Sequence, residues 1–190
     1  GHIGRVLEEL DASGHAEDTV VVFMADHGDG AGHHRWNQKQ TLYDESVRVP
    51  FIVCDPAAGR RSVVDSTHLV SSIDIVPTVL DYAGVGRPEH VCGASLRDVI
   101  TSGSTSSPSQ YVVSETLFGT GADISGWEGR MVRSDRFKYV VYNHGERREQ
   151  LFDMEADPGE VRNLAQDPSC SGELHRHRLW LQEWCRSTGD

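Results

Sequence analysis

An aspartate and a histidine stand side by side at the end of a short apolar run, as Asp26 and His27 after residues 20–25. The run is rich in β-branched residues and too short for an ordinary helix, so it predicts a strand buried on both faces. Open α/β sheets place their chemistry at the carboxyl ends of strands. There, a carboxylate can supply oxygen to a hard cation, and an imidazole can bind it or orient a neighbour. The plainer alternative is that Asp26 caps the next turn and His27 is a buried structural histidine.

A polar segment follows and contains one lysine, Lys39, before a second apolar run at 51–53. A lysine is a flexible point charge that suits a sulfate oxygen or a developing anionic leaving group. By itself, without a wider motif, Lys39 is better interpreted as a solvated surface lysine. His33 and His34 could join His27 in a zinc site, but adjacent histidines rarely bind one ion together and no cysteine stands nearby.

The order of these residues resembles the sulfatase family of the alkaline-phosphatase-like superfamily. The matching motifs are D-H-G-D at 26–29, G-x-H at 32–34, K-Q-T at 39–41 and Y-x-E-S-V-R-V-P at 43–50. The resemblance implies that Asp26 and His27 bind the active-site divalent cation, with Ca²⁺ expected and Mg²⁺ or Mn²⁺ as alternatives. It also implies that Lys39 lies beside the sulfate and the bridging oxygen of the substrate, a sulfated small molecule or saccharide.

The resemblance further implies features that we do not find in this sequence. In the family, two more acidic metal ligands and a C-x-P-S-R-type motif belong to a larger N-terminal portion, and the cysteine of that motif becomes the formylglycine nucleophile. Cys54-Asp55-Pro56 is a chance similarity, because Ala57 and Ala58 follow it. We therefore interpret the chain as the C-terminal portion of a sulfatase that lacks the formylglycine region, and we expect it to be inactive alone.

Other side chains are candidates for contacts with substrate. His34 would either contact the substrate or brace its loop, and Asp29 is expected to brace the same loop. Trp127 falls in a predicted glycine-rich loop, 119–129, and an aromatic ring there can stack on a sugar. A basic edge for a sulfated sugar, or else a solvated charged face, is predicted from Arg130, Arg133, Lys138, Arg147 and Arg148.

The composition narrows the classes of partner. The chain has 190 residues and a formal net charge of −11, which argues against non-specific binding to nucleic acid or to anionic membranes. No apolar run has the length of a transmembrane helix, and no signal-peptide pattern is visible. Sulfatases are often exported, so the compartment stays open. The four cysteines permit disulfides without requiring them.

Periodicity predicts the elements that position these residues. Apolar residues at helical spacing predict a helix ending at Gly14, and Ser71 with Asp74 predicts a capping box for a second helix. Alternating runs predict a hairpin at 130–133 and 137–142, followed by a strand at 150–153. The last helix presents Leu174, Leu181, Trp184 and Cys185 on one face, with His175, Arg176, His177 and Arg178 mostly outside it.

The predicted fold class is α/β, the C-terminal part of an alkaline-phosphatase-like parallel-sheet domain plus a small antiparallel sheet with a terminal helix. The predicted domains are 1–101 for the α/β core, 102–109 for a Ser/Gly/Pro-rich linker and 110–190 for the antiparallel α+β subdomain. Two alternatives for function remain. One is a phosphonate or phosphodiester hydrolase of the same superfamily, and the other is a non-catalytic fragment that forms a homo-oligomer through an exposed sheet edge.

Overall fold

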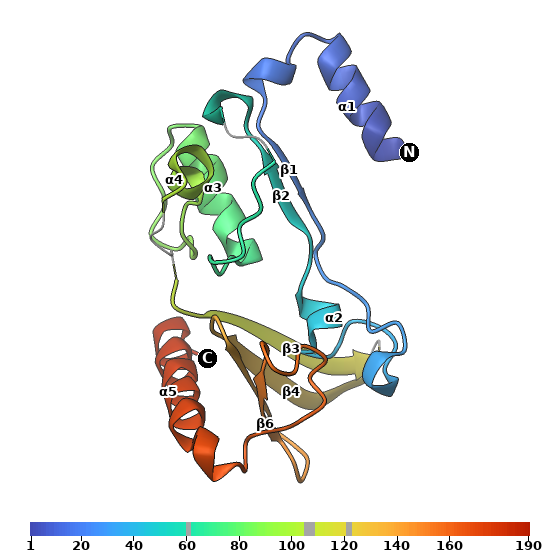
Figure 1. The fold of residues 1–190 in the computed structure, drawn as a ribbon, viewed down its shortest axis with the longest axis vertical. Helices are drawn as coiled ribbons and strands as arrows, with labels where there is room; N and C mark the ends of the chain where they lie inside the picture. Colours follow the sequence, from blue (N-terminus) through green and yellow to red (C-terminus); the bar gives the residue numbers. More distant parts are fainter. Residues whose placement is uncertain (60–61, 105–108, 121–122) are drawn as a thin grey trace. The chain divides into compact units, whose positions relative to one another are not determined.

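The computed structural model describes residues 1–59, 62–104, 109–120 and 123–190 (Figure 1). The chain divides into two compact units: the first unit is Gly1–Ala25 with Pro50–Pro108, and the second unit is Asp26–Val49 with Ser109–Asp190. Half of the predicted linker, residues 105–108, lies outside the described residues, and the predicted domain division stays a prediction. Within the described residues, no helix combines the length and apolar character needed to cross a membrane.

The first unit holds a strand pair and the first two predicted helices. Its elements are α1 (His2–Ala12), β1 (Val21–Met24), β2 (Phe51–Cys54), α3 (Ile75–Tyr82) and α4 (Arg97–Ser102). Both predicted strands are confirmed, and β2 is the antiparallel partner of β1, whereas we expected parallel neighbours. Burial on both faces was a wrong prediction, because the cross-strand partners Phe23 and Ile52 are 40% and 59% exposed.

The predicted capping box precedes α3 and is confirmed. The Asp74 carboxylate accepts hydrogen bonds from the backbone N–H of Ser71 at 2.8 Å and from that of Ala94 at 2.8 Å. The carboxylate therefore satisfies an orphan donor at the helix start and also anchors the chain that returns after the helix. Pro77 lies in the first turn of α3, where its missing N–H costs nothing.

The second unit is built on a four-stranded antiparallel sheet in the order β3-β4-β5-β6. Its elements are α2 (Asp44–Val47), β3 (Val112–Thr120), β4 (Asp123–Arg133), β5 (Phe137–Tyr142), β6 (Glu149–Asp153) and α5 (Ser171–Thr188). The predicted hairpin, the following strand and the final helix are confirmed.

The predicted loop at 119–129 is wrong, because β3 and β4 extend through most of it. A register shift after Phe118 and the positive φ of Gly126 (69°) absorb the irregularity that the glycines suggested. Gly129 is needed for packing, since a Cβ there would lie 2.5 Å from the Tyr142 ring. These glycines therefore shape strands and do not interrupt them.

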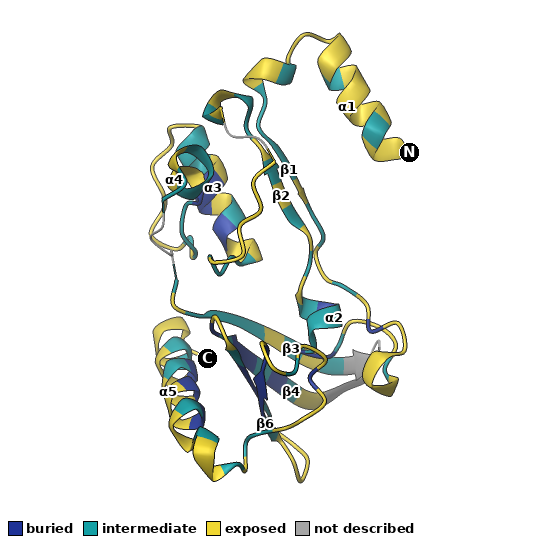
Figure 2. Cartoon of the chain, in the orientation of Figure 1, coloured by how far each residue is buried: buried dark blue, intermediate teal, exposed yellow. Residues whose placement is uncertain are grey.

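The two faces of this sheet are covered by different parts of the second unit (Figures 1 and 2). On one face, Val132, Tyr139 and Leu151 form a buried cluster with Leu174 and Leu181 of α5. On the other face, Leu42 packs on Met131 and Val140. The segment 26–49, which carries Asp26, His27 and Lys39, is thus fastened to the sheet face opposite α5.

One residue of α5 contradicts the predicted exposure pattern. His177 is fully buried, although we placed it mostly outside the apolar face. Its Nδ1 donates to the Glu173 carbonyl at 2.8 Å, and its Nε2 lies 3.0 Å from the Ser134 hydroxyl. These two partners satisfy the ring, so a histidine is tolerated in the core.

Candidate functional site

Asp26 and His27 follow β1 after one residue, Ala25, and present two potential ligand atoms close together. His27 Nδ1 lies 2.8 Å from the Gly28 carbonyl, which can only accept, so this nitrogen carries the proton. The neutral ring then keeps a lone pair on Nε2, which lies 3.4 Å from Asp26 Oδ2. The Asp26 side chain is 85% exposed. A carboxylate oxygen and an oriented imidazole nitrogen therefore converge at an open surface.

The surroundings of Asp26 favour its ionised form. The backbone N–H of His27 donates to Asp26 Oδ1 at 2.9 Å and is the main reason that the pKa of this carboxyl lies below its usual value. The positive charge of Lys39 acts in the same direction. The structure thus brings the exposed Lys39 within electrostatic reach of the pair, and Asp26 is a charged oxygen donor at neutral pH.

Two glycines set the path of the backbone beside the pair. The Gly28 N–H donates to the Ser46 carbonyl at 2.8 Å, and a Cβ at Gly28 would lie 1.9 Å from the Glu45 carbonyl oxygen. At Gly30, a Cβ would lie 2.7 Å from the Trp36 carbonyl oxygen. Only glycine permits these approaches, which explains why glycines alternate after Asp26.

The loop between the pair and Lys39 holds an unusual backbone. Ala31, His34, Arg35 and Gln38 all have positive φ, at 45°, 51°, 60° and 84°. Non-glycine residues adopt this region at a cost and do so where surrounding contacts impose it. One such contact is the predicted brace from Asp29, whose Oδ1 accepts the Ala31 N–H at 2.8 Å.

The two adjacent histidines of this loop have different partners. The His34 ring stacks on Tyr43 with centroids 3.7 Å apart and planes 3° apart. His33 Nδ1 lies 3.0 Å from Glu45 Oε1. Among the residues that the structure describes, no three His, Cys, Asp or Glu side chains are arranged to hold a metal ion, which contradicts the zinc alternative built on His27, His33 and His34. The donor set at Asp26 and His27 fits two ligands of a divalent cation.

The other candidates lie on the sheet and differ in their surroundings. Arg130 is paired with Glu115 at 3.2 Å, with Glu128 at 3.4 Å and with Asp190. These carboxylates raise the pKa of Arg130, and the hydrogen bond to Asp190 contributes most. The guanidinium group is therefore already paired. Trp127 is 48% exposed, and its ring lies 5.4 Å from that of His144. Trp127 therefore has a free aromatic surface, whereas Arg130 is engaged in ion pairs.

The prediction of a basic edge or a solvated face is wrong for Lys138. Its side chain is fully buried and pairs with Asp44 and Glu160. We missed this cluster because Lys138 alternates with apolar residues in a strand and Glu160 follows Asp157-Pro158-Gly159, a turn signal. The period-2 pattern did place Lys138 on the face of Val140, which is buried under the segment 26–49.

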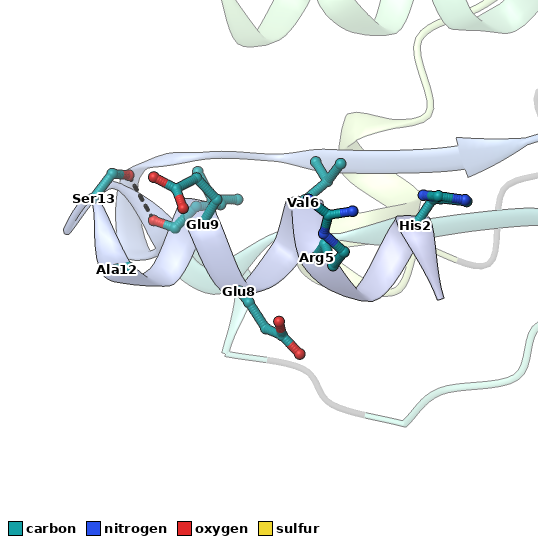
Figure 3. A pocket seen from close by; sticks show the side chains of 8 residues that line it. His2, Arg5, Val6, Glu8, Glu9, Ala12 and Ser13 are labelled. Atoms are coloured by element: carbon teal, nitrogen blue, oxygen red, sulfur yellow. Dashed lines mark hydrogen bonds between the residues drawn. The ribbon is translucent and has the colours of Figure 1, made fainter.

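A surface hollow in the first unit is unrelated to these residues. Figure 3 shows that it runs along α1, and it is lined by His2, Arg5, Val6, Glu8, Glu9, Leu10, Ala12 and Ser13. All of these belong to one exposed helix or its end, and none is a predicted site residue. The segment 26–39 remains the candidate site.

Comparison with known proteins gives one consistent picture. Residues 32–182 match the family described as N-sulphoglucosamine sulphohydrolase, C-terminal. A Δ4,5-hexuronate-2-O-sulfatase from Bacteroides thetaiotaomicron is 37% identical over 99% of this chain and 39% of its own length. Arylsulfatase K from Mus musculus is 33% identical over 87% of this chain and 30% of its own length. The chain thus spans roughly a third of the length of these two relatives.

Solved structures agree with the sequence relatives. The structure of a 2-O GAG sulfatase covers 97% of this chain and 40% of its own, with 37% identity and a TM-score of 0.89. A protein solved with its substrate D-glucosamine-2-N,6-O-disulfate covers 97% of this chain and 37% of its own, with 26% identity and a TM-score of 0.80. The phosphonate monoester hydrolase from Silicibacter pomeroyi covers 98% of this chain and 38% of its own, with 32% identity and a TM-score of 0.84. The predicted fold class is confirmed.

Proposed function

Because the chain belongs to the sulfatase family and matches its C-terminal portion, we propose that it is part of a sulfuric-ester hydrolase acting on a sulfated sugar or an aryl sulfate. Asp26 and His27 form half of the divalent-metal site, and Lys39 lies at the sulfate. The observation that carries the proposal is the convergence of Asp26 Oδ2 and His27 Nε2 at 3.4 Å. The fixed tautomer of His27 supports it, since a metal-binding imidazole needs its free nitrogen aimed outward.

Each residue has a separate task in this proposal. Asp26 offers a charged oxygen and His27 a nitrogen to a cation, with Ca²⁺ preferred and Mg²⁺ or Mn²⁺ as alternatives. The cation would neutralise charge on the sulfate group. The Lys39 ammonium binds a sulfate oxygen and stabilises negative charge on the departing ester oxygen. His34 is held by Tyr43, which supports a bracing role for it.

Two ligands are too few for a firmly bound cation, since Ca²⁺ takes about six to eight and Mg²⁺ about six. We therefore propose that the remaining ligands and the formylglycine nucleophile come from residues outside this chain, and that the chain alone is inactive. Titration calorimetry of Ca²⁺ into the purified chain tests this half-site. Binding should be absent, or weak and unchanged by Asp26→Ala. Tight binding that Asp26→Ala abolishes would show that this chain builds a complete site.

The activity itself is tested in an intact enzyme that carries this chain. Asp26→Asn, His27→Gln and Lys39→Met should each lower the hydrolysis rate of a sulfated saccharide and an aryl sulfate by about 100-fold or more, because each removes charge stabilisation at the reacting group. Arg186→Gln changes an exposed basic residue of α5 to which no role is assigned, and it is the control. A full rate in Asp26→Asn would overturn the proposal.

A saccharide substrate is favoured over a small aryl sulfate by the exposed ring of Trp127. An aromatic face of this kind can pack on a sugar ring. The names of the hexuronate-2-O-sulfatase and of the glucosamine disulfate complex point in the same direction. Trp127→Ala should raise the KM for a sulfated disaccharide and leave that for a small aryl sulfate unchanged; equal effects on both would argue against stacking.

The phosphonate or phosphodiester alternative is supported by the similarity to the Silicibacter pomeroyi hydrolase. Both chemistries need a cation and a lysine beside a tetrahedral anionic centre, so the described residues suit either. The ratio of rates on matched sulfate, phosphonate and phosphate esters separates them. A ratio that favours phosphonate would replace our assignment.

The non-catalytic alternative is supported by the exposed Phe23 and Ile52 on β1 and β2. A two-stranded sheet leaves both outer edges unpaired, and such edges invite pairing between chains. Sedimentation of the purified chain tests this. A stable dimer, together with inactivity of the longer enzyme, would favour a self-associating fragment.

A further inference from the structure

Lys138 is fully buried, which is unusual for a lysine. Its Nζ lies 2.7 Å from Asp44 Oδ1 and 2.8 Å from Glu160 Oε1. The side chains of Asp44 and Glu160 are 22% and 1% exposed. Burying three charges is costly unless each is paired, so the cluster persists only in a well-defined arrangement.

Glu160 follows β6 and, besides its pair with Lys138, makes a second contact, with the segment 26–49. Its Oε2 accepts the backbone N–H of Asp44 at 2.7 Å. Its own backbone has a φ of 51°, an unfavourable conformation for a residue other than glycine. Burial raises the pKa of Glu160, and the neighbouring Lys138 ammonium opposes that rise. The contacts of this carboxylate therefore offset both backbone strain and desolvation.

A short chain of contacts leads from this cluster to the candidate metal ligands. Asp44 is the first residue of α2, and the Ser46 carbonyl in the same helix accepts the Gly28 N–H at 2.8 Å. Gly28 also lies against the Glu45 carbonyl and directly follows His27. The position of α2 thus limits where Asp26 and His27 can lie.

We propose that Lys138, Asp44 and Glu160 are positioning residues that hold α2 on the sheet and thereby fix Gly28 and the Asp26–His27 pair. The inference rests on the proposed function for the role of the pair, and its structural part can be tested without metal or substrate. The sheet then contributes to the site through this buried charged cluster. Lys138 is the member of the cluster that belongs to the sheet, and it acts without touching the reacting group.

The test is amide hydrogen exchange of the purified chain by NMR, read at the Gly28 amide. The variant Lys138→Met/Glu160→Gln removes two opposite charges together, which limits loss of global stability. Exchange at Gly28 should rise about tenfold or more, as expected when charge-assisted hydrogen bonds are lost. The amides of Leu151 and Leu181, which report the core against α5, should keep their wild-type rates.

A milder variant and a matched control accompany it. Asp44→Asn leaves the Lys138–Glu160 pair in place and should also accelerate exchange at Gly28. Arg136→Met breaks the 2.6 Å pair between Arg136, in the turn from β4 to β5, and Asp153, at the end of β6. No contact of Arg136 with α2 is found among the described residues. This control should leave the Gly28 amide unchanged.

Three results would overturn the inference. The Gly28 rate could stay at its wild-type value in both cluster variants, or rise only in step with the rates at Leu151 and Leu181, or rise equally in Arg136→Met. The second result would assign the cluster to global stability alone. None of these rates depends on catalysis, so failure of the proposed sulfatase activity would leave this test standing, and the reverse also holds.

Discussion

The two compact units differ in how completely each buries its apolar side chains. Among the described residues, every buried apolar side chain except Pro77 and Leu96 belongs to the second unit. The first unit instead carries most of the exposed large apolar residues: Ile3, Val6, Leu7, Phe23, Ile52, Val63, Val64, Ile73, Val76, Val79 and Val85. The second unit therefore has a core of its own, whereas the first unit buries few apolar side chains.

This difference bears on the candidate site. Asp26, His27 and Lys39 follow β1 in sequence, yet the segment that carries them belongs to the second unit. Leu42 anchors that segment in the apolar core, and the Lys138 cluster anchors it through charge. The chain thus places its exposed site residues on the better-packed unit, where a strained loop can be supported.

The largest expected difference is in hydrogen exchange of two helices. α1 contains no buried residue, whereas α5 buries Leu174, His177 and Leu181. An isolated helix of the length of α1 is marginal in water. The amides of α1 should exchange through local opening at about 0–1 kcal/mol, and those of α5 at the stability of the second unit, several kcal/mol higher. Hydrogen exchange by mass spectrometry or NMR measures both.

Equal protection of α1 and α5 would break the comparison. It would show that α1 is covered by an apolar surface in solution, for example in an oligomer. Repeating the measurement over a range of chain concentrations separates these cases, since protection through association rises with concentration.

A smaller difference is expected between two truncations. Leu151 is fully buried between the sheet and α5, so Leu151→Ala should destabilise the second unit by about 2–5 kcal/mol. Val79 of α3 is 53% exposed, and Val79→Ala should change stability by about 0.5 kcal/mol or less. Urea unfolding followed by far-UV circular dichroism measures both variants.

Tryptophan fluorescence gives this experiment a local probe. All tryptophans of the chain, Trp36, Trp127, Trp180 and Trp184, belong to the second unit. Their signal should shift its midpoint in Leu151→Ala and stay fixed in Val79→Ala. A fluorescence midpoint that moves equally in both variants would mean that the two units unfold as one.

How much of this could be predicted from the sequence differs between the units as well. Runs with apolar residues, bounded by turn signals, located β5 and β6, whose sheet is covered on both faces, and helical spacing located α5, which buries one face. The strand β1 was located too, but its burial was not, since a short apolar run looks the same whether or not its faces are covered.

The site divides in a similar way. The D-H-G-D motif identified Asp26 and His27 as candidate ligands. The capping box of Ser71 and Asp74 could be predicted because its two residues are close in sequence. The Lys138 cluster could not be predicted, because Asp44 and Glu160 stand 94 and 22 residues away from Lys138 in the sequence. A single charged residue in a strand usually faces water. Backbone approaches such as Gly28 to α2 also depend on tertiary contacts, although the glycine itself hints at one.

A still smaller effect is expected from pH, within the core of the second unit. Burial lowers the pKa of His177, partly offset by its hydrogen bond to the Glu173 carbonyl. The unfolded chain then takes up the proton first, so the contribution of His177 to stability falls as pH drops below about 6.5 and levels off below the folded-state pKa. The slope is at most about 1.4 kcal/mol per pH unit for one proton.

The pH dependence due to His177 is measured as the difference in urea midpoint between wild type and His177→Gln across pH 5–8. That difference should shrink as the pH falls, because the variant has no group to titrate there. His175→Gln, at an exposed position of the same helix, should run parallel to wild type. A constant difference for His177→Gln would show that the buried ring is not the cause.

The smallest effect on stability is expected at the candidate site itself. Asp26 is exposed, and Asn at this position keeps an oxygen that can accept the His27 N–H. Asp26→Asn should therefore leave the tryptophan-detected urea midpoint unchanged, while the same substitution should lower the hydrolysis rate of the intact enzyme by about 100-fold or more. This separation is expected of a residue whose charge serves a ligand and not the fold. A lowered midpoint in Asp26→Asn would instead make the carboxylate a structural partner of His27, and the contrast between a packed unit and an open site on its surface would no longer hold.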